Sequence, residues 1–149
     1  MTLKTQVLNK LQIFLKEKIS ILKNELDKIQ SEKNEIIKSS VGDKFETTRS
    51  LMQVEYDKLQ NQIFKLQDQL NKIQLIDLNK KYSKIEFGSL VKTNKYYYLV
   101  FLGLGKFDVK EFSVFLISLS SPIGKIIINK KKGESFIFNN KVEIILDIT

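Results

Sequence analysis

Two carboxylates stand close together in a chain that is otherwise basic. The segment SSVGDKFETT, residues 39–48, places Asp43 and Glu46 three positions apart. The 149-residue chain contains no cysteine and no histidine, which excludes disulfides, thiolate metal sites and the commonest general base. Any chemistry must therefore use carboxylates, lysines or hydroxyl groups, and the Asp43–Glu46 pair is the first candidate.

The same spacing also has a purely structural explanation. Asp-x-x-Glu at a helix start is the spacing of a capping box, with Asp43 as the N-cap and Glu46 reaching back to the N-cap amide. The positive end of the helix dipole would favour each carboxylate by about 0.3–1 kcal/mol. A capping role and a chemical role are compatible in the same free protein, so both stay open at this point.

Helical sequence flanks the acidic pair on both sides. Residues 3–79 contain one glycine and no proline, a composition that favours helices. Apolar residues recur at threes and fours in a first run and at a strict 4,3 spacing in a second: Leu8, Leu11, Leu15, Ile19, Leu22, Leu26, Ile29 and Ile36, then Met52, Tyr56, Leu59, Ile63, Leu66, Leu70 and Ile73. Lys33 interrupts the first stripe. This spacing predicts a coiled coil, and a helix over residues 3–39 would be about 55 Å long.

The break between the two runs decides how the helices are arranged. Residues 39–43, Ser-Ser-Val-Gly-Asp, predict a stop and a restart, and a short connection makes neighbouring helices antiparallel. Residues 1–79 are thus expected to form an antiparallel coiled-coil hairpin with its tip at residues 39–46, and the protein to be a monomer. One long helix that dimerises in parallel is the alternative, because Gly42 inside a helix would cost only about 1 kcal/mol.

Residues 80–149 have the composition of a β-rich domain. Segments rich in β-branched and aromatic residues predict strands: residues 85–93, 95–103, 111–119, 134–139 and 141–148. Ser121 is a natural N-cap and Pro122 suits a first helical position. The expected fold class is therefore α+β, in which the helical hairpin precedes a small antiparallel sheet domain with one short helix. Residues 77–84 would form the joint.

Two details of this domain can be predicted from single residues. Asn139 and Asn140 can occupy left-handed turn positions between the last two strands. Along the last strand, apolar residues alternate with the others, as in a half-buried strand: Val142, Ile144, Leu146 and Ile148 alternate with Glu143, Ile145 and Asp147. The tyrosine run at residues 96–98 is expected to contribute mainly to the core rather than to stack on nucleobases.

Charge and hydropathy limit the class of protein. The formal net charge is +8, and most of the excess lies in residues 80–149, with 12 basic against 6 acidic residues, compared with 13 against 11 in residues 1–79. This distribution suggests a polyanionic partner, although a solvated basic surface also explains it. No apolar run reaches the ~18 residues of a membrane span, and no signal peptide is visible, so a cytoplasmic protein without a membrane partner is expected.

The combination of a helical hairpin and this sheet domain resembles the bacterial Gre-type transcript-cleavage factors. Members of that family carry a Ser-Pro-Leu/Ile-Gly/Ala-Lys/Arg segment, followed by Gly-Lys-Lys-x-Gly-Asp/Glu and two closing strands. The matching residues here are Ser121, Pro122, Ile123, Gly124, Lys125, Lys130, Lys131, Gly133 and Glu134, and Asn129 stands where glycine is usual. FGSLV at residues 87–91 resembles the family's entry strand. The resemblance covers nearly the whole chain.

The resemblance extends to the acidic pair. The hairpin tip of the family reads Gly-Asp-Leu-Ser-Glu-Asn, and Gly42, Asp43 and Glu46 keep their places in it. The resemblance implies that the hairpin enters the secondary channel of RNA polymerase and brings both carboxylates to the polymerase active site. The sheet domain, of FKBP-like fold, would dock at the channel rim. The protein would act on the 3′ end of the nascent RNA only indirectly, through the polymerase active site.

In this role the protein is not itself an enzyme and needs no cofactor of its own. The polymerase's two-metal centre would cleave backtracked RNA, since such a centre stabilises both the attacking and the leaving oxygen. Mg²⁺ is typically bound by one or two carboxylates plus phosphates. Asp43 and Glu46 would therefore act as catalytic and metal-binding residues only when they share Mg²⁺ with the polymerase.

Further binding residues follow from the same resemblance, and some of them depart from the family. At the tip the candidates are Lys44, Phe45 and Arg49; in the sheet domain they are Ser121, Pro122, Lys125, Lys130 and Lys131. The lysine run at residues 130–132 could contact phosphates or an acidic polymerase surface, or could be a solvated turn.

The departures at the tip leave two other functions open. Lys44 places a cation between the two acids, and Phe45 is apolar where solvent is expected. These two residues raise the alternative of a regulator that occupies the channel without stimulating cleavage. A prolyl isomerase or chaperone built on the FKBP-like sheet is a third hypothesis, although the sequence marks no aromatic pocket for proline.

Overall fold

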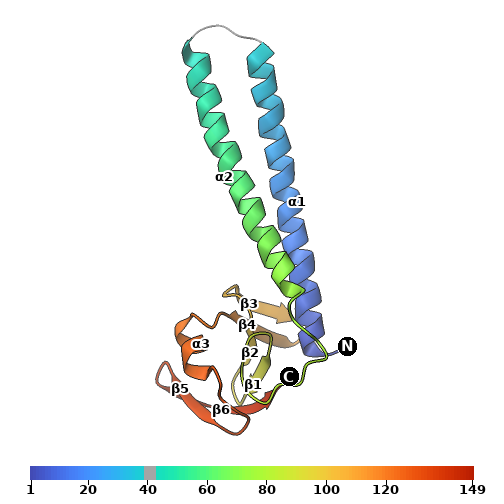
Figure 1. Cartoon of the computed structure of the whole chain (residues 1–149), viewed down its shortest axis with the longest axis vertical. Helices are drawn as coiled ribbons and strands as arrows, with labels where there is room; N and C mark the ends of the chain where they lie inside the picture. The colour runs from blue at the N-terminus through green and yellow to red at the C-terminus, as the bar shows by residue number, and fades with distance from the viewer. Residues whose placement is uncertain (39–42) are drawn as a thin grey trace. The chain divides into compact units, whose positions relative to one another are not determined.

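Two long helices begin the chain in the computed structural model. It describes residues 1–38 and 43–149, with side chains for residues 1–36 and 46–149. Helix α1 (Leu3–Lys38) and helix α2 (Asp43–Ile73) contact each other as a hairpin (Figure 1). The predicted helical hairpin and the α+β fold class are confirmed.

The apolar stripes of the two helices form the seam of the hairpin. Leu15 and Ile19 of α1 and Leu59 and Ile63 of α2 are buried, as the heptad spacing predicts. The structure also accounts for the lysine within the stripe. The Lys33 ammonium donates a hydrogen bond to the side-chain oxygen of Gln53 on α2, so a polar link between the helices replaces an apolar contact there.

The chain forms two compact units. The hairpin unit consists of residues 12–72, and the sheet unit consists of residues 1–11 together with residues 73–149. The first turns of α1 thus belong to the unit that contains the sheet, where Val7 and Leu11 are fully buried. The sheet unit is therefore built from two segments that lie far apart in the sequence.

The sheet has six strands in the order β3-β4-β2-β1-β6-β5. The strands and the short helix between β4 and β5 have these bounds: β1 Leu90–Thr93, β2 Tyr97–Val100, β3 Gly105–Val109, β4 Phe112–Ile117, α3 Pro122–Ile127, β5 Ser135–Phe138 and β6 Lys141–Ile148. Neighbouring strands pair antiparallel, except that β2 and β4 are parallel. The sheet is thus mostly antiparallel, with one parallel pair formed by its second and third strands.

Helical segments cover both faces of the central strand β2. Successive side chains of a strand point to opposite faces, and Tyr97 and Tyr98 line different cavities. The cavity beside Tyr97 also contains the first residues of the chain, whereas the cavity beside Tyr98 contains Ile123 of α3. Because both faces are covered, Leu99 and Val100 are each fully buried. This burial explains why the segment is a continuous apolar run rather than an alternating one.

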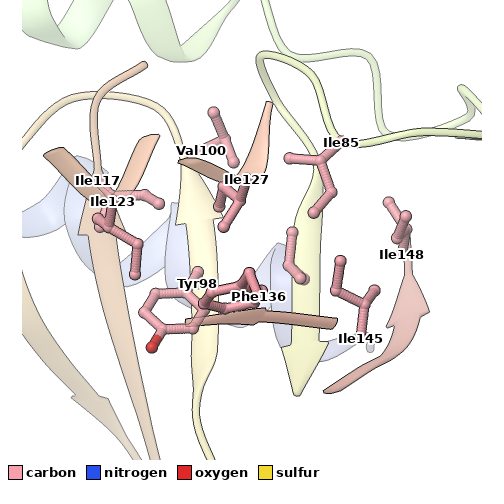
Figure 2. Close-up of a cluster of buried hydrophobic side chains, with 10 residues drawn as sticks. Ile85, Tyr98, Val100, Ile117, Ile123, Ile127, Phe136, Ile145 and Ile148 are labelled. Carbon is pink, nitrogen blue, oxygen red and sulfur yellow. The ribbon is translucent and has the colours of Figure 1, made fainter. Parts of the chain in front are cut away.

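The core on the α3 side joins residues from almost every element of the unit. Figure 2 shows these side chains converging from the strands, from α3 and from the loop that holds Ile85. The cluster consists of Ile85, Val91, Tyr98, Val100, Ile117, Ile123, Ile127, Phe136, Ile145 and Ile148. Helix α3 has only six residues, too few to be stable alone, so its position depends on this packing.

Strand β6 corrects the prediction about which of its faces is buried. Val142 and Ile144 are exposed, whereas Glu143 and Ile145 are buried. The pairing with β1 shifts by one residue at Leu146, and such a bulge moves the following residues to the opposite face. The alternation in the sequence is real, but the buried face in the first part of the strand is the one that carries a carboxylate.

Candidate functional site

The predicted tip residues lie at the start of α2. The backbone is helical from Asp43 onward, while Gly42 and the side chains of Asp43, Lys44 and Phe45 lie outside the described residues. Glu46 is exposed and begins the described side chains of this helix. Three residues of helix correspond to a rise of about 4.5 Å, so the backbone positions of the two acids fall within one turn of α2, as the catalytic role requires. Asp43 is itself the first helical residue, so it does not stand at the N-cap position that the capping prediction gave it.

Arg49 is the next charged residue on the same helix, and it is also exposed. It lies one turn beyond Glu46, at a spacing that brings side chains to the same side of a helix. A carboxylate and a guanidinium are thus available together near the start of α2. The other predicted binding residues lie in the sheet unit.

The Ser-Pro segment forms the start of α3, as predicted. The Ser121 hydroxyl accepts a hydrogen bond from the amide of Gly124 at 3.1 Å and donates one to the carbonyl oxygen of Ser118 at 2.6 Å. Pro122 occupies the first helical position, where its fixed φ suits the helix. Ser121 and Pro122 are therefore explained by helix capping in the free protein, and Lys125 is exposed one turn further on.

The loop after α3 holds the other predicted lysines. Asn129 has a φ of 65° and Gly133 a φ of 91°, so the backbone is left-handed at both positions. Asparagine adopts this conformation more readily than other non-glycine residues, which explains how Asn129 can occupy a position that usually favours glycine. Between them, Lys131 is exposed and Lys130 is half-buried, with its carbonyl oxygen bound to the amide of Ile85 at 2.8 Å.

A buried carboxylate lies on the α3 side of the sheet, at a position where the sequence predicts no functional group. Glu143 is 2 % exposed and accepts hydrogen bonds from the hydroxyl of Thr93 at 2.7 Å and from that of Tyr98 at 2.9 and 3.0 Å. Burial, together with the hydrogen bond to Glu143 and its negative charge, raises the pKa of Tyr98. The phenol therefore stays protonated as the donor. The only available signal in the sequence was an acidic residue within an apolar strand.

A second unexpected group is a buried lysine at the start of α1. Lys4 is 5 % exposed; its Nζ lies 3.3 Å from the carbonyl oxygen of Thr149 and 4.5 Å from the centre of the Tyr82 ring. It lines a cavity of about 650 Å³ together with Lys80, Lys81 and Lys92. Burial lowers the pKa of Lys4 to about 8, an effect that Asp77 partly opposes.

Stability should depend on pH through Lys4. With its pKa lowered from 10.5 to about 8, the folded state binds fewer protons than the unfolded state between these values, so the free energy of unfolding rises with pH across this window. We expect Lys4→Met to be more stable than wild type near pH 7, by up to about 3 kcal/mol, and the difference to shrink towards pH 10.5. Urea unfolding at several pH values measures it; parallel curves for the two proteins would contradict the prediction.

Neither a metal-ligating cluster nor a membrane-spanning helix is found among the described residues, and no family model matches the chain. Among the residues described, no group of three or more carboxylates lies close enough together to hold a metal ion. No helix within the described ranges is long and apolar enough to cross a membrane. No protein-family model matches the chain, and no curated protein matches it either. The geometry of the two units and the sequence motifs they carry are therefore the basis for any assignment of function.

Proposed function

We propose that this chain is a Gre-type factor that inserts its hairpin into the secondary channel of RNA polymerase and stimulates cleavage of backtracked RNA. One observation carries the proposal: a long two-helix hairpin whose helices are joined at Gly-Asp-x-x-Glu is followed by a small sheet unit that contains the Ser-Pro-Ile-Gly-Lys helix start. The reactive centre in this scheme belongs to the polymerase. The chain contributes a hairpin long enough to enter the channel and two carboxylates, Asp43 and Glu46.

The hairpin unit has the dimensions for such a role. Its part of α1, residues 12–38, corresponds to a length of about 40 Å. The seam holds the two helices together through buried leucines and isoleucines, and the bond between Lys33 and Gln53 links them nearer to the tip. A hairpin with these contacts can carry residues at its tip into a narrow channel as one stiff body.

The chemistry of the tip also fits. Carboxylate oxygens are the ligands that Mg²⁺ prefers, and one or two carboxylates plus phosphates are the usual set. When bound, the ion would stabilise the attacking and leaving oxygens of phosphodiester cleavage. The part of the chain's own residues would be to add ligands and to orient a water molecule: Asp43 and Glu46 start the same helix, and the described one, Glu46, is exposed.

The sheet unit offers surfaces for docking at the channel rim. Lys125 and Lys131 are exposed beside α3, and cations there would favour an acidic partner surface. On β5 and β6, Ile137 is paired with Val142 across the strands, and both are exposed, as is Ile144. Exposed apolar groups that lie next to each other are typical of interaction surfaces. These features support the FKBP-like docking role that the resemblance implies.

The tip acids should be essential for stimulation. In backtracked complexes of the cognate polymerase, we expect wild type to accelerate 3′-end cleavage and Asp43→Asn or Glu46→Gln to lower the rate about 100-fold, the size of effect seen when a ligand or a preorganised polar group is lost from a reaction centre. The matched control is Glu55→Gln, which removes an exposed carboxylate from the same helix and should leave the rate unchanged.

Two outcomes would count against the assignment. A wild-type protein that binds polymerase but does not accelerate cleavage would exclude the cleavage function. Acceleration that both tip variants retain would exclude Asp43 and Glu46 as the acting groups, although it would leave polymerase binding intact.

A non-catalytic channel-binding regulator is the second candidate, and the charge at the tip favours it. Lys44 lies between the two acids and Arg49 follows within two turns, so positive charge would oppose the binding of a metal ion. In that case polymerase binding would survive both tip substitutions, and cleavage would be slowed or unchanged by wild type. Comparing Lys44→Gln with wild type separates the two candidates, because removing the cation should increase stimulation only if the acids act on a metal.

A further inference from the structure

A cavity on the α3 side of the sheet combines aromatic walls with a buried carboxylate. Its volume is about 290 Å³. Tyr96, Tyr98, Phe115 and Phe138 line it together with Glu143. The rings of Tyr96 and Phe115 meet at 89° with centres 5.4 Å apart, and those of Tyr96 and Tyr98 meet at 69°. Rings at such angles form adjacent walls of a box rather than a flat stack.

The carboxylate in this cavity is hydrogen-bonded, and its partners among the described residues are uncharged. Its donors, the hydroxyls of Thr93 and Tyr98, are both neutral. None of the ion pairs found among the described residues involves Glu143. Burying a carboxylate without a counter-charge is unfavourable. A cation that enters the cavity would supply the missing charge.

One cation of the chain itself is close by. Lys141 precedes Glu143 by two residues, so both belong to the same face of β6, and it also lines the cavity. It is nevertheless exposed and forms none of the ion pairs of the described residues. Lys141 therefore does not neutralise the carboxylate in an ion pair, and a cation that reaches Glu143 would have to enter through the cavity that both residues line. Lys141 would weakly repel such a cation.

We propose that this cavity binds the side chain of a lysine presented by another protein. The faces of aromatic rings attract ammonium groups, and a carboxylate forms strong charge-assisted hydrogen bonds with them. The cavity is at the lower limit of ligand pockets, which measure about 300–1,000 Å³, so it suits one side chain rather than a nucleotide. Anions are disfavoured by Glu143, and a purely apolar side chain would leave the carboxylate without a counter-charge. The inference goes beyond the polymerase proposal and involves none of the tip residues.

Two small probes separate charge from apolar contact. N-acetyl-lysine N-methylamide and N-acetyl-norleucine N-methylamide have side chains of similar shape and differ in the ammonium group. We expect the lysine compound to shift the NMR signals of Tyr96, Tyr98 and Glu143 with a Kd on the order of 1–10 mM, and the norleucine compound to bind at least about tenfold more weakly. Equal binding of the two, or binding of neither, would overturn the proposal.

Variants assign the binding to this cavity. Glu143→Gln keeps the size of the side chain and should weaken binding of the lysine compound about tenfold or more. Tyr96→Leu removes an aromatic ring from the wall of the cavity. Tyr96 is 41 % exposed in the free protein, and its loss should weaken binding of the lysine compound several-fold. If Glu143→Gln fails to fold, Tyr96→Leu is the variant that tests the proposal. Lys141→Met should strengthen binding. The control is Phe112→Leu, an aromatic residue of similar exposure, 36 %, that does not line the cavity.

A competing ligand has its own outcome. If a short peptide with a central proline binds the cavity and the lysine compound does not, the proposal is wrong and the prolyl-isomerase hypothesis gains support. Loss of lysine binding in the Phe112→Leu control as well as in Tyr96→Leu would also refute the assignment to this cavity.

Discussion

Gly124→Ala is expected to lower the free energy of unfolding of the sheet unit by at least about 3 kcal/mol. A Cβ atom at this position would lie 2.0 Å from the carbonyl oxygen of Ser118 and 2.8 Å from the Cα of Leu119. Both are backbone atoms, so no side-chain rotation can relieve the overlap. The Ser118 carbonyl also accepts the hydroxyl hydrogen of Ser121, and moving it would disturb the cap of α3.

The matched control is Gly103→Ala. A Cβ there would meet only the hydroxyl oxygen of Ser118, at 3.8 Å, which is an ordinary contact, so a change within about 1 kcal/mol is expected. Urea unfolding followed by tyrosine fluorescence suits the measurement, because the chain has no tryptophan and four of its five tyrosines lie in the sheet unit. Equal stability of the two variants would show that α3 can shift away from the backbone of Ser118 and Leu119 without cost.

Ile127→Ala should destabilise the same unit by about 2–5 kcal/mol. Ile127 is completely buried in the core that Figure 2 shows, and truncation to alanine would leave a cavity between α3 and the sheet. Ile123 lies one turn earlier in the same core, so these two residues attach a helix of six residues that has little stability of its own.

Ile126→Ala is the control for that prediction. Ile126 is the preceding residue of the same helix but is 37 % exposed, and alanine has a higher helix propensity than isoleucine. Its substitution should change the stability by less than about 1 kcal/mol. If both variants lost the same stability, the effect would come from the helix itself rather than from the packing of Ile127 in the core.

The helices and most strands could be predicted because each has a local signal. The heptad spacing indicated both long helices. The interruption of the apolar stripe at Lys33 does not end helix α1, because the Lys33 ammonium donates a hydrogen bond to Gln53 on α2. Ser121 and Pro122 indicated the start of α3, and Asn139 and Asn140 have φ of 51° and 61°, as the predicted turn requires. In each case one or two residues determine the local backbone.

Features that depend on distant contacts could not be predicted. Strand β3 carries Lys106 and Asp108 and has little burial at the edge of the sheet, so its sequence lacks the apolar pattern of a strand. The sequences of β2 and β4 contain no pattern that indicates their parallel pairing. The buried side of β6 depends on the bulge at Leu146, and periodicity alone assigns Glu143 to the wrong face.

The candidate sites divide in the same way. The cap formed by Ser121 and the left-handed position of Asn129 follow from local sequence. The roles of Asp43 and Glu46 stay predictions until the cleavage assay is done. The cavity around Glu143 is formed by residues from β2, β4, α3, β5 and β6, so only the assembled sheet brings its carboxylate and its rings together.

The division of the sheet unit into two sequence segments sets the order in which the protein can fold during synthesis. The hairpin needs only contacts between helices that are neighbours in the sequence, so it can form early. Its formation brings the two ends of residues 12–72 close together. This lowers the entropy cost of later joining residues 1–11 to residues 73–149 in the sheet unit. The sheet must wait longer. Leu90 and Thr149 exchange two backbone hydrogen bonds, at 2.7 and 2.9 Å, so the pairing of β1 with β6 cannot be completed until residue 149 has been made, although β1 can pair with β2 earlier. Residues 1–11, although synthesised first, are therefore among the last to be buried.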